Sequence, residues 1–327
     1  MIRLMCLLGA VVALLFAASL AIGPAEASFA QSLSSLLADD GTPFTLVMRE
    51  IRLPRALLAV MIGASLGLAG AAMQGYLRNP LAEPGLIGVS SSAALGAVLS
   101  LQTGFAAAFA LALPLSALAA ALVGVLLVLM LAGPRGASMT LILAGIAISA
   151  MAGALISLVL NLSPNPYAAN EIVFWMMGSL ADRSMLHVWL ALPVMALGWG
   201  LLGTLGRGLD ALTLGEDAAS SMGVNLSRLR LSLVVGVSCV VGAGTAVAGA
   251  IGFVGLVVPH ILRPFVGGRP SRLLWASALG GAALVLAADI AVRLIMPDRD
   301  LKLGVVMALI GAPLFLHLIF KTRKELS

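Results

Sequence analysis

Long apolar stretches separated by short polar connections dominate this chain. A helix that crosses a bilayer needs about 20 apolar residues, and backbone exposed to lipid must form its hydrogen bonds within the helix. The pattern therefore predicts an all-α polytopic membrane protein, one domain over residues 1–327, with about ten helices. Their expected ranges are 4–23, 56–77, 86–101, 106–132, 138–160, 188–205, 231–250, 251–266, 273–295 and 303–320. The run 231–266 is broken only by glycines and Pro259, so it forms a hairpin or a re-entrant element.

Composition supports lipid as the main solvent. Hydrophobic residues make up 61% of the chain, charged residues only 10%, and mean hydropathy is +1.11. Soluble domains carry roughly 25% charged residues, so a cytosolic enzyme and a disordered scaffold are excluded. The 19 Lys and Arg residues are dispersed between apolar runs, which argues against nucleic acid as a partner. Cys6 and Cys239 lie far apart in apolar runs and predict no disulfide or metal site.

The basic residues indicate an orientation. With both termini in the cytoplasm, most Lys and Arg residues fall inside, as the positive-inside rule requires. The exceptions are Arg49, Arg52, Arg55, Arg183, Arg293, Arg299 and Lys302. Such an external cluster favours an anionic partner on that face, or snorkelling at the membrane edge. The first run has an alternative interpretation as a secretory signal that ends near residues 25–27.

Two segments resemble each other at an offset of 179 residues. This alignment pairs Gly63 with Gly242, residues 69–71 with 248–250, and Pro80 with Pro259. The two copies cross the membrane in opposite senses, which is typical of inverted repeats in transporters. Ordinary close packing through small residues is the alternative explanation.

Few residues offer chemistry inside the membrane. The ionisable candidates are Asp289, His260 and His317. Asp289 and Arg293 are four residues apart, so they lie on one helix face and can neutralise each other. No metal-ligand spacing, nucleophile elbow or phosphate-binding loop occurs, so we predict neither a catalytic site nor a cofactor, and any ATP energy must come from another chain.

The most polar cytoplasmic connection spans residues 209–230. Residues 217–222 suit a short helix that follows Gly215 and Glu216 and stops at Gly223. This segment either binds a partner protein and transmits its motion to the adjoining helices, or is a plain connector.

Six sequence motifs are distributed along the chain from about residue 46 to the C-terminus. They are RLPR (52–55), RNPLAEPGLIGVS (78–90), FWMMGSL (174–180), LGEDAASSMGV (214–224), GAIGFVGLVVPHILR (249–263) and GAPLF (311–315). In these motifs the chain resembles the permease subunits of type II ABC importers for iron-siderophores, haem and cobalamin. The resemblance implies a bacterial inner-membrane homodimer of ten-helix subunits in which helices two to five and seven to ten form an inverted repeat. It also implies two cytoplasmic ATPase subunits and a periplasmic binding protein.

The resemblance also assigns roles to particular residues. The coupling segment that enters the ATPase would contain Leu214, Gly215, Glu216, Asp217, Ala218 and Gly223. Arginines that dock the binding protein would be Arg52, Arg55 and Arg293. The chain departs from the family where Glu-Leu-Pro-Val-Gly is often found, because it has Asp300-Leu301-Lys302-Leu303-Gly304. This change adds a cation on the outer face and leaves the docking geometry there open.

The substrate is not encoded in these motifs. We expect an iron chelate, a ferric siderophore or haem, with cobalamin as the alternative. Met73 and Gln74 are candidate pathway residues, although packing explains them equally well. An ion-gradient-driven transporter would also fit an inverted repeat, and Asp289 would be its acidic site; a membrane enzyme would need a catalytic pair, and none is found.

Overall fold

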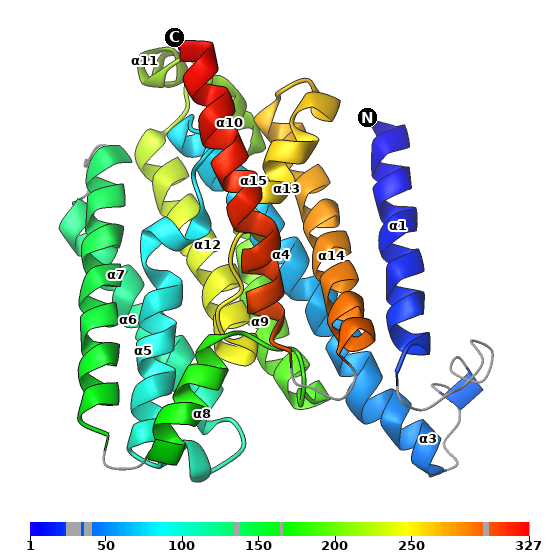
Figure 1. Ribbon diagram of the computed structural model, residues 1–327. Helices are drawn as coiled ribbons and strands as arrows, with labels where there is room; N and C mark the ends of the chain where they lie inside the picture. Colours follow the sequence, from blue (N-terminus) through cyan, green and yellow to red (C-terminus); the bar gives the residue numbers. More distant parts are fainter. Residues whose placement is uncertain (24–33, 36–40, 134–137, 164–165, 297–300, 327) are drawn as a thin grey trace.

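The computed structural model describes residues 1–23, 34–35, 41–133, 138–163, 166–296 and 301–326, and these residues form helices without any strand (Figure 1). The first half contains α1 (Ile2–Ala21), α3 (Pro43–Leu46), η1 (Val47–Arg52), α4 (Leu53–Leu77), η2 (Pro84–Ile87), α5 (Val89–Gln102), η3 (Phe105–Ala107), α6 (Ala112–Ala132), α7 (Ser138–Asn161) and α8 (Pro166–Met176). The second half contains α9 (Met185–Gly203), α10 (Gly206–Leu212), α11 (Glu216–Ser221), α12 (Leu226–Ala248), α13 (Val254–Leu262), η4 (Pro264–Val266), α14 (Pro270–Ile295) and α15 (Leu303–Leu326).

Within the described residues, seven helices are long and apolar enough to cross a membrane. They are α1, the continuous rod of α3, η1 and α4 (Pro43–Leu77), α6, α7, α9, α12 and α14. Shorter apolar helices occupy Val89–Gln102 and Leu303–His317. A helix therefore lies within each of the ten predicted runs, and the protein is an all-helical membrane protein.

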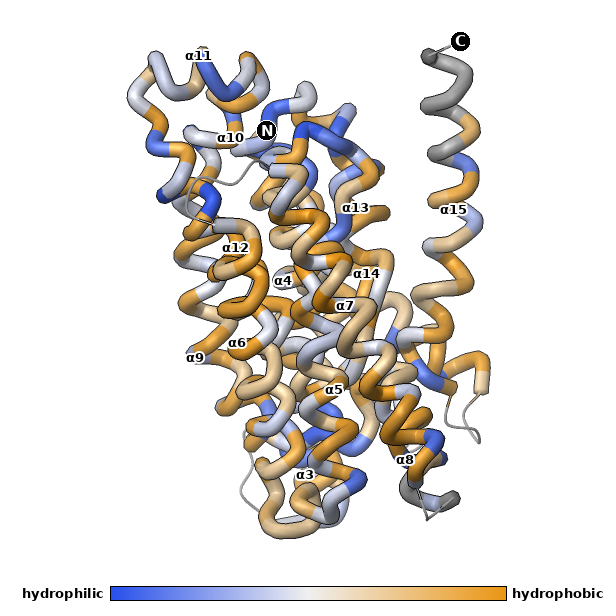
Figure 2. The backbone as a smooth tube through the Cα atoms, turned by 90° about the vertical axis from the view of Figure 1, so that its left-hand side faces the viewer, coloured by the Kyte–Doolittle hydropathy of each residue, from blue (hydrophilic) through white to orange (hydrophobic). Residues whose placement is uncertain are grey.

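The helices share one axis and define two ends of the molecule. The start of α1, the end of α15 and α11 lie at one end, here called the α11 end, whereas α3 and α8 lie at the other, the α8 end (Figure 1). Hydrophobic residues cover the middle of the bundle, and hydrophilic residues gather around α11 (Figure 2). This distribution is the one expected for helices that cross a bilayer.

The run 231–266 is a hairpin whose second arm is only partly helical. Helix α12 ends at Ala248, and Gly249 follows with a φ of 73°, in the left-handed region that favours glycine. The chain returns through a non-helical segment to α13, which has only nine residues. Interrupted helices in membranes occur where the backbone is buried in protein or lines a cavity.

Small residues allow the buried helix α4 to approach α14 closely. Gly63 and Gly67, one turn apart on α4, face Gly281 and Ser277 on α14, and a Cβ at either glycine would collide with a carbonyl oxygen there. Such contacts bring helix backbones together in membranes, where dispersion replaces the hydrophobic effect as the driving force. Packing through small residues, the alternative to a repeat, is thus present in the structure.

The predicted residue-by-residue pairing at an offset of 179 does not match the helix bounds, so this pairing is wrong. Residues 69–71 lie inside α4, whereas Ala248 is the last residue of α12 and Gly249 and Ala250 are not helical. Pro80 lies in a connection, whereas its predicted counterpart Pro259 lies inside α13. The abundance of Ala and Gly produced matches at a register that the backbone does not share.

Candidate functional sites at the two ends of the bundle

A buried carboxylate joins two arginines near the α8 end. The side chain of Asp289 on α14 is 1% exposed. Arg55 on α4 donates from Nε to its two carboxylate oxygens, at 2.9 and 3.1 Å, and Nη2 of Arg293 lies 3.0 Å from Oδ2. Because a buried charge needs a partner, Asp289 stabilises both arginines and is stabilised by each of them. The predicted pairing of Asp289 with Arg293 is confirmed, and Arg55 is a further partner.

Arg293 and a further arginine, Arg52, bind the end of α1. Arg52 is 4% exposed and donates from Nη1 to the carbonyls of Leu20 and Ala21, at 2.9 and 3.1 Å. Arg293 donates from Nη1 to the carbonyls of Ser19 and Ile22, both at 2.9 Å. The last carbonyls of a helix lack partners within it, and cations near them are favourable. The arginines therefore hold α1 against α4 and α14.

The three predicted docking arginines are thus brought together by the fold, from positions far apart in the sequence. Their charged groups are engaged within the subunit, and the side chains of Arg55 and Arg293 are 18% and 12% exposed. A docking partner would meet a partly covered cluster rather than three extended side chains.

A second polar network fastens the interrupted span to α4. Glu83, in the connection after α4, accepts a 2.9 Å hydrogen bond from the backbone N–H of Phe253, which precedes α13 with a φ of 67°. The amide of Gln74 donates to the carbonyls of Gly255 and Leu256, each at 3.3 Å, and accepts from Arg263 at 2.7 Å. Sequence analysis assigned no role to Glu83, although an acidic residue between apolar runs was a signal for one.

The two predicted pathway residues lie inside the subunit. Met73 and Gln74 are each 1% exposed. Met73 belongs to the hydrophobic core, and Gln74 holds α13. Of the other two ionisable candidates, His260 lies in α13 and His317 is exposed on α15. Among the described residues, the hydrogen bonds and ion pairs of the Asp289 side chain are with Arg55 and Arg293, and neither histidine takes part in them.

The polar segment at the α11 end forms a small helical hairpin. The predicted short helix is confirmed as α11, Glu216–Ser221. It stops in a Schellman motif, because the N–H of Val224 bonds to the carbonyl of Ala219 and that of Gly223 to Ser220, with a φ of 84° at Gly223. Ala219 is buried, while Leu214, Glu216, Asp217 and Met222 are exposed.

The hairpin is tied to α14 through α10. Asp210 accepts hydrogen bonds from the N–H and the hydroxyl of Ser271, at 2.9 and 2.6 Å. This carboxylate caps the first turn of α14, where unpaired N–H groups and the helix dipole favour an anion. A displacement of the hairpin would therefore act directly on α14, which packs against α4.

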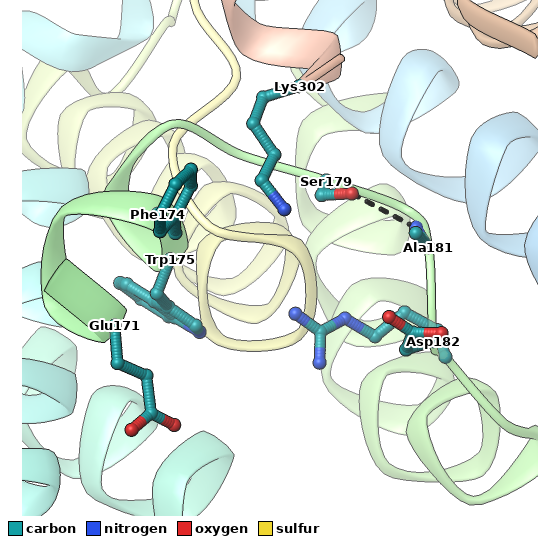
Figure 3. A pocket seen from close by; sticks show the side chains of 8 residues that line it. Glu171, Phe174, Trp175, Ser179, Ala181, Asp182 and Lys302 are labelled. Atoms are coloured by element: carbon teal, nitrogen blue, oxygen red, sulfur yellow. Dashed lines mark hydrogen bonds between the residues drawn. The ribbon is translucent and has the colours of Figure 1, made fainter. Parts of the chain in front are cut away.

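A pocket of about 160 Å³ lies near the α8 end, between α8, the α8–α9 connection and the start of α15 (Figure 3). Its lining residues are Glu171, Phe174, Trp175, Ser179, Ala181, Asp182, Arg183 and Lys302. Burial lowers the pKa of Arg183 and the neighbouring Asp182 opposes that shift, but an arginine remains protonated in proteins. No group of three or more His, Cys, Asp or Glu side chains suited to a metal ion occurs among the described residues.

Comparison with known proteins decides the family. The family model described as the FecCD transport family matches residues 11–321. The chain belongs to the FecCD transport family. The Fe(3+) dicitrate transport system permease protein FecD of Escherichia coli (strain K12) is 40% identical to this FecCD permease over 85% of the chain and 86% of FecD. The vitamin B12 import system permease protein BtuC of Salmonella typhi is 38% identical over 84% of each chain.

A solved structure supports the same family. It is described as an inward-facing conformation of a putative metal-chelate type ABC transporter. It matches with a TM-score of 0.86 and 32% identity, over 98% of this chain and 100% of that one. The FecCD permease is therefore a non-catalytic subunit of an ABC importer, which implies ATPase and binding-protein partners. Membership of the FecCD family also rules out an ion-gradient-driven transporter. Asp289, the acidic site that such a transporter would use, forms ion pairs with Arg55 and Arg293.

Proposed function

We propose that this protein is the permease subunit of an ATP-driven importer that moves an iron chelate, a ferric siderophore or haem, from the periplasm to the cytoplasm. The observation that carries the proposal is the likeness, over nearly the whole chain, to a structure described as a metal-chelate type transporter. The 40% identity to FecD, named for Fe(3+) dicitrate, points the same way. Cobalamin is the alternative, because BtuC is almost as similar.

The proposed topology has ten membrane spans, both termini in the cytoplasm and the α8 end facing the periplasm. Beyond the seven long helices, α5, α13 and α15 complete the set. The described ends of the chain both lie at the α11 end of the bundle, as an even number of crossings requires (Figure 1). Most basic residues between the runs also fall on that side under this topology. The proposed location is the inner membrane of a bacterium.

Helix contacts support an inverted repeat of the second to fifth and seventh to tenth spans. The repeat would relate α4, α5, α6 and α7 to α12, α13, α14 and α15. Helix α4 packs on α14 and α13, and α12 packs correspondingly on α6 and α5. The contacts of α5 with α6 and α7 likewise have counterparts between α13 and both α14 and α15. This equivalence of contacts holds between elements and does not depend on the residue register.

The α11 hairpin, within the segment 209–230, is the proposed coupling element. Its surface would enter a cleft on the ATPase, with Leu214, Gly215, Glu216, Asp217, Ala218 and Gly223 in the interface. The exposed Leu214 and the acidic Glu216 and Asp217 suit a contact of this kind. Closure of the ATPase would move α11 and α10, and the Asp210–Ser271 contact would pass that motion to α14. Packed helices respond by shifting between discrete arrangements.

Arg52, Arg55 and Arg293 are the proposed docking residues for the binding protein. Acidic side chains of that protein would bind Arg55 and Arg293, which Asp289 already holds in place. They would compete with Asp289 for hydrogen bonds from these two arginines. Docking would then loosen the contact between α4 and α14. Charge-assisted contacts of this kind mainly set orientation and encounter rate, and they weaken with salt.

The proposed pathway runs between two copies of this subunit. Met73 and Gln74 would line it only in a conformation in which α13 moves away from α4, because Gln74 now binds the backbone of α13. Release of Gln74 from Gly255 and Arg263 is therefore part of the proposed transport cycle.

Reconstitution tests the proposal. The permease, its cognate ATPase and its cognate binding protein are placed in liposomes, and uptake of ferric siderophore, haem and cobalamin is measured in parallel. We expect uptake of an iron chelate that needs ATP and all three components, and that Glu216→Lys abolishes. Uptake of cobalamin alone would select the alternative substrate. Arg55→Gln is the suitable docking variant, because Arg55→Glu would place a second carboxylate beside Asp289 and disturb the fold.

A further inference from the structure

The pocket near the α8 end contains two buried N–H donors for which the described residues supply no acceptor. Nε1 of Trp175 and Nε of Arg183 are buried, and neither has a hydrogen-bond partner among the described residues. Both residues line the same pocket. A buried donor without an acceptor destabilises the fold, because the group loses its hydrogen bond to water, so such groups in folded proteins call for an explanation.

A second cation faces the same space. Nζ of Lys302 lies 5.5 Å from the centre of the Phe174 ring, a cation–π contact that helps to position the ammonium group. In the close-up, the ammonium end of Lys302 and the nitrogen edge of Trp175 both point toward the middle of the pocket (Figure 3). Lys302 is also the residue by which the chain departs from the usual Glu-Leu-Pro-Val-Gly motif.

The acidic residues of the pocket leave the two donors without an acceptor. The carboxylate of Glu171 points away from Trp175 (Figure 3). Asp182 is exposed, and although its charge acts on Arg183, it accepts no hydrogen bond from Nε of that residue. The pocket thus combines two cations, Arg183 and Lys302, with two buried N–H groups, Nε1 of Trp175 and Nε of Arg183, that find no acceptor in the described part of the chain.

We propose that this pocket binds a carboxylate group, held by Trp175, Arg183 and Lys302. A carboxylate offers two oxygens with about four acceptor positions, and arginine matches that geometry particularly well. The pocket of about 160 Å³ is smaller than the roughly 300–1,000 Å³ typical of drug-sized ligands, so it suits one small acid or one acidic side chain.

The carboxylate has two possible sources. It belongs either to a free polycarboxylate, such as citrate or a chelate built on it, or to an acidic side chain of the docked binding protein. The direction from which it arrives rests on the proposed topology. Binding of a carboxylate to the purified protein does not depend on that topology. The inference can therefore fail while the proposed transport function stands, and the proposed transport function can fail while the inference stands.

The experiment measures binding of radiolabelled citrate to the full-length permease in nanodiscs, without partner proteins. Trp175→Phe removes one N–H and keeps the ring, Arg183→Gln removes the charge and keeps hydrogen-bonding capacity, and Lys302→Leu removes the ammonium. If citrate is the occupant, we expect Arg183→Gln to weaken its binding about tenfold or more, as for the loss of a charge-assisted hydrogen bond. Arg207→Gln and Trp189→Phe, both exposed and outside this pocket, are matched controls that should bind as the unaltered protein does.

A second arm identifies the source. Affinity for the cognate binding protein is measured for the same variants, with thermal unfolding as a check on folding. Citrate binding lost in the pocket variants supports a free carboxylate. Without citrate binding, a roughly tenfold loss of binding-protein affinity in Arg183→Gln and Lys302→Leu, but not in Arg207→Gln, supports an acidic side chain. Unchanged binding of both probes in folded variants would overturn the proposal.

Discussion

At the scale of single residues, Asp289 shows how one buried carboxylate organises an end of the bundle. It forms ion pairs with Arg293 on its own helix and with Arg55, which lies 234 residues away in sequence. Arg293 in turn binds the last turn of α1 through Ser19. The Asp289–Arg293 pair followed from helix periodicity. The participation of Arg55 and α1 did not, since it depends on how three helices meet.

Asp289→Asn should destabilise the protein substantially. The change leaves the guanidinium groups of Arg55 and Arg293 without a counter-charge, and breaking a buried ion pair costs about 3–5 kcal/mol. Thermal unfolding in detergent should show a clear drop in Tm, whereas the exposed Asp217→Asn should unfold like the unaltered protein. An unchanged Tm for Asp289→Asn would mean that the cluster does not stabilise the fold.

At the scale of elements, two contacts decide how α14 behaves. Its middle packs on α4 through glycine, and its first turn is capped by Asp210 from α10. The first contact makes α4 and α14 a tightly packed pair. The second connects that pair to the α11 hairpin.

Gly67→Val tests the packed pair. The new side chain would meet the Ser277 carbonyl, and overpacking typically costs about 1–3 kcal/mol, more where backbone must move. We expect a lower yield of folded protein in size-exclusion chromatography. Gly153→Val on α7 is the matched control, because a Cβ added at Gly153 would have no neighbouring atom within 4 Å. Equal yields for both variants would contradict the close contact.

Asp210→Ala tests the connection to the hairpin. Loss of an N-terminal cap costs about 0.5–2 kcal/mol, so the protein should still fold. In reconstituted importer we expect less substrate moved per ATP hydrolysed, because α14 no longer follows the hairpin. Ser271→Ala, which keeps the backbone N–H bond and loses only the hydroxyl, should show a weaker effect. A normal transport ratio in Asp210→Ala would exclude this route.

At the scale of the whole molecule, the proposed topology separates two exposed positions. Tyr167 at the start of α8 is 84% exposed and Met222 beside α11 is 64% exposed. With Cys6 and Cys239 replaced by alanine, a membrane-impermeant thiol reagent added to intact spheroplasts should label Tyr167→Cys and not Met222→Cys. After lysis both should react. Labelling of Met222→Cys from outside would reverse the proposed orientation.

The sequence by itself determined the membrane class, the positions of the ten helical runs and the short helix of the polar segment. Each follows from local information, namely apolar length, glycine stops and the spacing of charges along one helix. Its motifs also indicated the family to which the chain proved to belong.

Only the tertiary structure decided the interruption before α13, the contacts of Glu83 and Gln74, and the burial of the arginines at the end of α1. It also brought Trp175, Arg183 and Lys302 to one pocket. In a chain rich in alanine and glycine, many registers look alike, which is why the offset of 179 failed. Contacts between helices distant in sequence depend on the shapes of their packed surfaces and on the pairing of buried polar groups. Neither property can be predicted from the local periodicity of the sequence.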